Sequence, residues 1–167
     1  MDMSSCSQRR NRGFTLVEMT TVLAVSGILL ASTIPLGSYW TQKAKMADAT
    51  GELTHSIGKA IGSALRNPNA LDADVAIAAV CISPDNEVTV LEANVGTPID
   101  CTNGNGNTLK TGTLPPGLEI TRFGQTQNCL CFNSSALLTN NNQCSTCSTN
   151  ATLDLTVGSQ TYSLHVQ

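Results

Sequence analysis

The sequence predicts an α+β fold, in which a long N-terminal α-helix packs on a small antiparallel β-sheet. Three observations support this prediction. Apolar residues recur at helical spacing as far as residue 66, short strand-like segments follow Pro68, and the chain ends in a hairpin pattern. Only 13% of the 167 residues are charged and the net charge is −3, so the chain is a poor candidate for a general nucleic-acid binder.

Residues 14–36 form the first half of the predicted helix and carry one charged side chain, Glu18. As a helix this run would be about 34 Å long, enough to cross a hydrocarbon core of ~30 Å. Arg9, Arg10 and Arg12 precede it, which predicts a single membrane span with the N-terminus in the cytoplasm. The rest of the chain would then lie outside the cytoplasm.

Residues 37–67 form the amphipathic half of the same helix. Apolar side chains recur at helical spacing between Met46 and Leu65, with charged residues between them. Asn67-Pro68-Asn69 ends the helix, because the residue before a proline avoids helical geometry. The remaining chain is too short to cover so long a helix, so its first half needs lipid or other copies of itself.

Residues 68–167 are predicted to form a β-rich globular domain with a disulfide-bonded C-terminal region. Four short segments predict strands, at residues 75–82, 87–93, 118–123 and 128–132, and residues 96–117 predict an irregular loop. The clearest element is the terminal hairpin. Gly158-Ser159 favours a type II′ turn, which places Leu155 opposite Tyr162 and Leu153 opposite Leu164.

The junction Arg12-Gly13-Phe14-Thr15-Leu16-Val17-Glu18-Met19 resembles the class III signal of type IV pilins and pseudopilins. The resemblance implies that a prepilin peptidase cuts between Gly13 and Phe14 and removes residues 1–13 as a leader. It also implies methylation of the new N-terminal residue, Phe14. A glutamate at the fifth position after the cut and a proline at the twenty-second are typical of this family, and Glu18 and Pro35 occupy these positions.

A carboxylate within an apolar helix is costly in lipid, so Glu18 needs an explanation. One interpretation is that its side chain extends to the membrane interface. The other is that it pairs with a cation, and the free amine of Phe14 in a neighbouring subunit would supply one away from water. The resemblance implies this assembly salt bridge. Gly27 and Pro35 predict a kink, either an ordinary membrane-helix bend or local melting that lets helices pack in a filament.

Seven cysteines are many for so short a chain and favour disulfides in an exported setting. Loss of the leader would remove Cys6 and leave six candidates for three disulfides: Cys81, Cys101, Cys129, Cys131, Cys144 and Cys147. The last four also have a spacing that suits a tetrathiolate zinc site. Because oxidising conditions favour disulfides, we expect Cys81–Cys101 and bridges from the 129–131 segment to Cys144 and Cys147.

The sequence predicts no catalytic function, no cofactor and no metal. It lacks the G-x-S-x-G, H-E-x-x-H, Walker and G-x-G-x-x-G motifs, and it has only two histidines, His55 and His165. An ordinary secretory signal peptide is the main alternative for the N-terminus. Against it, the apolar run is too long, Glu18 interrupts it, and no small-x-small cleavage site follows.

The predicted function is that of a structural subunit of a type IV pilus or related filament. Similarity of Glu52-Leu53, of residues 63–66 and of the final hairpin to minor pilins and H-type pseudopilins favours a minor pilin that acts in pilus assembly. A major pilin, a type II secretion pseudopilin, and a tip adhesin or DNA-uptake subunit that binds through residues 96–147 stay open.

The resemblance also implies partners and a location. The expected partners are other pilin subunits, the prepilin peptidase, the inner-membrane assembly platform and, before assembly, membrane lipid. Nucleic acid is expected only at a filament tip. The chain would first lie in the inner membrane, with its N-terminus in the cytoplasm, and then in an extracellular pilus or periplasmic pseudopilus.

Overall fold

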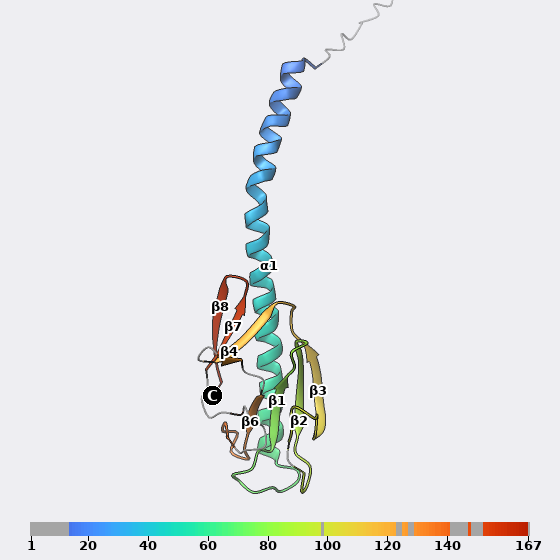
Figure 1. The fold of residues 1–167 in the computed structure, drawn as a ribbon, viewed down its shortest axis with the longest axis vertical. Coiled ribbons are helices and arrows are strands. Elements are labelled where there is room, and N and C mark those ends of the chain that lie inside the picture. The colour runs from blue at the N-terminus through green and yellow to red at the C-terminus, as the bar shows by residue number, and fades with distance from the viewer. Residues whose placement is uncertain are drawn as a thin grey trace, which may run out of the picture. The chain divides into compact units, whose positions relative to one another are not determined.

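The computed structural model describes residues 14–97, 99–122, 125–126, 129–140, 147 and 152–166. Within these ranges the chain forms a helix, α1, followed by strands β1 to β8 (Figure 1). It divides into two compact units, Met1–Trp40 and Thr41–Gln167. A helix packed on antiparallel sheets confirms the predicted α+β class.

The helix α1 spans Leu16–Arg66 and is helical through both Gly27 and Pro35. It ends where Pro68 predicted. The side chain of Asn67 closes this end, because it donates to the carbonyl of Leu71 at 2.8 Å and accepts from the Leu71 amide at 2.9 Å. The helix terminus therefore has local hydrogen-bond partners.

The strands of the described residues form two antiparallel four-stranded sheets instead of the one small sheet expected. The first has the order β3-β2-β1-β6 and consists of Asn107–Thr113, Glu87–Glu92, Ala78–Ile82 and Cys129–Phe132. The second has the order β5-β4-β7-β8 and consists of Gln125–Thr126, Leu118–Arg122, Thr152–Val157 and Gln160–His165. β3 lies within residues 96–117, so the prediction of a wholly irregular loop there was wrong.

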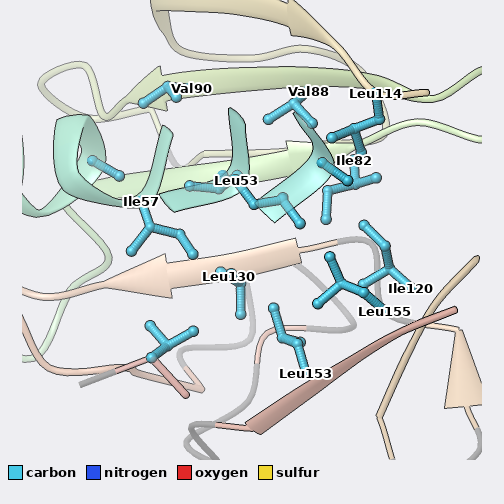
Figure 2. Close-up of a cluster of buried hydrophobic side chains, with 14 of the residues drawn as sticks. Leu53, Ile57, Ile82, Val88, Val90, Leu114, Ile120, Leu130, Leu153 and Leu155 are labelled. Carbon is cyan, nitrogen blue, oxygen red and sulfur yellow. The ribbon is translucent and has the colours of Figure 1, made fainter. Parts of the chain in front are cut away.

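The main core lies between α1 and the two sheets of the second unit. The helix contributes a buried stripe at Ala49, Leu53, Ile57, Ala60 and Ala64, which repeats every three or four residues. Figure 2 shows Leu53 and Ile57 among side chains from both sheets, including Val88, Leu130 and Leu155. One amphipathic face of the helix therefore serves both sheets, which explains why two sheets can share a single core.

The β7–β8 hairpin confirms the predicted register. Val157 pairs with Gln160, Leu155 with Tyr162 and Leu153 with Leu164. Gly158 has a φ of +61°, as the first central residue of a type II′ turn requires. A two-residue turn and a period-two pattern were therefore enough to predict this element.

Apolar side chains of the first unit are exposed along the described helix. Ten of them are 54–81% exposed: Phe14, Leu16, Val17, Met19, Val22, Leu23, Val25, Ile28, Leu29 and Leu30. In the part of the chain that the structure describes, no helix is long and apolar enough to cross a membrane, so the span predicted for residues 14–36 is not confirmed.

Candidate functional site

The first candidate site is the start of α1. The amide of Glu18 donates to the Thr15 hydroxyl at 3.2 Å, so Thr15 caps the helix. Thr15 and Glu18 have the S/T-x-x-E spacing of a capping box, a signal that the sequence analysis missed. A carboxylate in the first turn also suits the positive end of the helix dipole. Glu18 therefore has a local structural role to weigh against a role in assembly.

Hydroxyl groups beside Glu18 bond within the helix itself. Thr20 donates to the carbonyl of Val17 at 2.9 Å, and Thr21 donates to the carbonyls of Val17 and Glu18 at 3.0 and 2.9 Å. These threonines need no external partner for their protons. Glu18 is the one charged residue in the sequence of residues 14–40, so it is the ionic feature of an otherwise apolar and hydroxyl surface.

The second candidate site is a cysteine cluster. In β1, Val80 and Ile82 face the main core, while Ala79 and Cys81 face a second cluster that contains the cysteines. Disulfides join Cys81 to Cys101 and Cys131 to Cys147, with Cα–Cα distances of 5.3 and 5.6 Å. Both pairs are among those that the sequence analysis expected.

A zinc site at this cluster is less favourable than disulfides. The sulfurs of Cys129, Cys131 and Cys147 lie within 4.8 Å of one another, and so do those of Cys81, Cys101 and Cys129. However, sulfurs already joined in disulfides lack the negative charge of the thiolates that zinc binds. Cys144, the fourth residue of the predicted tetrathiolate, lies outside the described residues.

The third candidate site is a groove of about 760 Å³ in the second unit. Met46, Gly51 and His55 of α1 line one side, and Thr161 and Tyr162 of the edge strand β8 line the other. The groove does not involve residues 96–147, where a tip ligand was expected to bind. This cavity therefore gives no support to a binding surface in those loops.

Comparison with known families finds a match at the first of these sites. Residues 8–34 match the family model of the prokaryotic N-terminal methylation motif. The chain carries a class III prepilin signal. This signal is that of the type IV pilin and pseudopilin family, whose members are structural, and it marks a substrate of prepilin peptidase. Neither a curated protein nor a solved structure matches the chain.

The structure describes only part of the class III prepilin signal. Phe14 precedes the helix and is 76% exposed, while Gly13 lies outside the described residues. Glu18 stands on the first turn of α1. Both positions fit an N-terminus that is presented to other molecules. The helix kink expected at Gly27 and Pro35 stays a prediction.

Proposed function

We propose that the chain is a structural subunit of a type IV pilus or related filament and acts as a minor pilin in pilus assembly. The observation that carries the proposal is a class III signal at the start of a helix, where ten apolar side chains between Phe14 and Leu30 are 54–81% exposed. Exposing apolar surface to water costs a free energy of about 25 cal/mol per Å², and an exposed apolar area of this size therefore needs a partner that covers it. Neighbouring subunits would cover it in a filament, and inner-membrane lipid before assembly.

We propose that Glu18 pairs with the methylated amine of Phe14 in a neighbouring subunit. The apolar surroundings favour this pairing, because opposite charges attract more strongly away from water. The competing explanation is that the Glu18 side chain serves only the capping box that begins at Thr15. The two explanations can be separated, because glutamine also suits this position of a capping box but carries no charge.

The test uses Glu18→Gln beside Glu18→Ala and Thr15→Ala. A salt bridge predicts that both Glu18 variants fail to enter sheared fibres, while Thr15→Ala still enters. A purely structural cap predicts that Glu18→Gln enters as well as the wild type, and this outcome would overturn the assembly role. Immunoblots of the membrane fraction control for the amount of each variant.

Intact mass spectrometry tests the processing directly. We expect a polypeptide that begins at Phe14 and carries one added methyl group. We also expect three disulfides, each of which removes two hydrogens relative to the reduced chain. A chain that begins elsewhere would contradict the proposed processing by prepilin peptidase.

Copy number separates the minor pilin from the alternatives. A minor pilin should be scarce in sheared fibres relative to the main subunit, whereas a major pilin should dominate them. A type II secretion pseudopilin should be absent from surface fibres and should affect protein export. Retention of a ligand by residues 41–167 would instead favour a tip adhesin or DNA-uptake subunit.

A further inference from the structure

We propose that the cysteine cluster is a disulfide-exchange site, in which the sulfur of Cys129 can exchange with either of two neighbouring disulfides. The Sγ atom of Cys129 lies 3.0 Å from that of Cys101 and 3.0 Å from that of Cys147. Each neighbour belongs to a different disulfide, Cys81–Cys101 or Cys131–Cys147. One sulfur is therefore in reach of both bridges at the same distance.

The strand register creates this arrangement. β1 and β6 are antiparallel neighbours, and Cys81 pairs with Cys129 in their ladder. Cys129 and Cys131 are two residues apart on β6, so their side chains share one face, with the Sγ atoms 3.5 Å apart. Cys129 is therefore flanked by one cysteine from each disulfide: Cys81 lies across the ladder, and Cys131 lies two residues along the same strand.

Exchange at this site needs no net oxidation. A thiolate at Cys129 attacks Sγ of Cys101, the Cys101–Cys129 bond forms, and Cys81 leaves as the thiolate. Attack on Sγ of Cys147 forms Cys129–Cys147 and releases Cys131 in the same way. Where Cys129 starts in a disulfide of its own, a small external thiol attacks the partner sulfur of that disulfide. The external thiol and the partner then form a mixed disulfide, and Cys129 leaves as the first thiolate.

Burial determines where an external thiol enters. Cys129, Cys131 and Cys147 are 1–5% exposed, whereas Cys101 is half-buried. A small thiol therefore reaches the Cys81–Cys101 bridge more easily than the Cys131–Cys147 bridge. Exchange through Cys129 would connect the buried bridge to the accessible one, so that wrong pairings within the cluster could be corrected without unfolding the domain.

The experiment is limited reduction of the purified full chain with about one equivalent of dithiothreitol, followed by alkylation and peptide mapping. Exchange predicts that the label appears on Cys131 as well as on Cys81, although the second bridge is buried. In Cys129→Ser the label should be lost from Cys131 and stay on Cys81 and Cys101. Label confined to Cys81 and Cys101 in the wild type would overturn the proposal.

A second measurement avoids the variant, because a serine hydroxyl at a buried position can disturb folding. The wild-type protein is reduced briefly, the reductant is removed, and samples are alkylated over time. Exchange predicts that the label moves between Cys81 and Cys131 while the total number of labelled thiols stays constant. A distribution fixed from the first sample onward would overturn the proposal.

Discussion

The ammonium group of Lys110 on β3 forms an ion pair with the carboxylate of Glu52 on α1. Lys110 also donates to the hydroxyl of Ser56 at 3.1 Å, and Ser56 is fully buried. A Cβ atom at Gly112 would overlap the Glu52 carboxylate, so a glycine there leaves room for it. Polar contacts therefore attach the edge strand β3 to the helix.

Replacing Lys110 with methionine should lower the free energy of unfolding by about 1–2 kcal/mol, because the side chains of the pair are only 19% and 27% exposed and Glu52 would lose its partner. Urea unfolding of residues 41–167 would measure this loss. Lys59→Met, at an exposed position of the same helix, is the matched control and should change the stability by less than about 0.5 kcal/mol. Equal effects of the two variants would contradict the assignment.

The same contacts explain why sequence patterns missed β3. Asn107–Thr113 has one large apolar residue, Leu109, so it shows neither alternation nor an apolar run. It is a strand because β2 supplies a hydrogen-bond ladder and because Glu52 lies opposite it. Both partners are distant in sequence, and local propensity contains no information about them.

Elements with local signals were predictable. The turn at Gly158-Ser159 specified the terminal hairpin, and Pro68 specified the helix end. By contrast, the cysteine cluster depends on Cys81 facing Cys129 across a ladder whose strands are 47 residues apart, between Ile82 and Cys129. The sequence therefore predicted candidate pairs of cysteines, but not that the sulfur of Cys129 would lie next to two disulfides.

Leu53→Ala should be among the more damaging single substitutions in the second unit. Leu53 is fully buried between the helix and the sheets, so its truncation leaves a cavity and should cost about 2–5 kcal/mol. Leu65→Ala makes the same chemical change on the same helix at a site that is 59% exposed. We expect the control to change the urea midpoint little, and a comparable loss at both positions would contradict the packing described.

Two glycine substitutions should have effects of opposite sign on stability. Gly106 has a φ of +139°, and a Cβ atom there would lie 3.0 Å from the carbonyl oxygen of Glu92. Gly106→Ala should therefore destabilise the domain by about 1–3 kcal/mol. Gly62 is an exposed helical glycine, and an added Cβ atom would meet nothing within 4 Å beyond the backbone of its own helix, so Gly62→Ala should stabilise by about 0.5–1 kcal/mol. Thermal unfolding would show both shifts, and shifts of the same sign would be inconsistent with these conformations.

The loop at Asp100 should respond to acid. Hydrogen bonds from the Asn103 side chain and, at 2.8 Å, from the Thr102 amide hold the pKa of Asp100 below its ordinary value of 3.8. A carboxyl group whose pKa is lower in the folded state stabilises that state above its ordinary pKa, and this contribution is lost as the pH falls through the folded pKa.

Asn103→Ala should therefore raise the pKa of Asp100 toward 3.8 and reduce the pH dependence of loop stability below that value. An NMR titration of the Asp100 carboxyl carbon would measure the change. Asn105→Ala is the control, because Asn105 bonds to Asp100 through backbone atoms that the substitution leaves in place. If the two variants shift the titration equally, the side-chain bond from Asn103 is not what holds the pKa down.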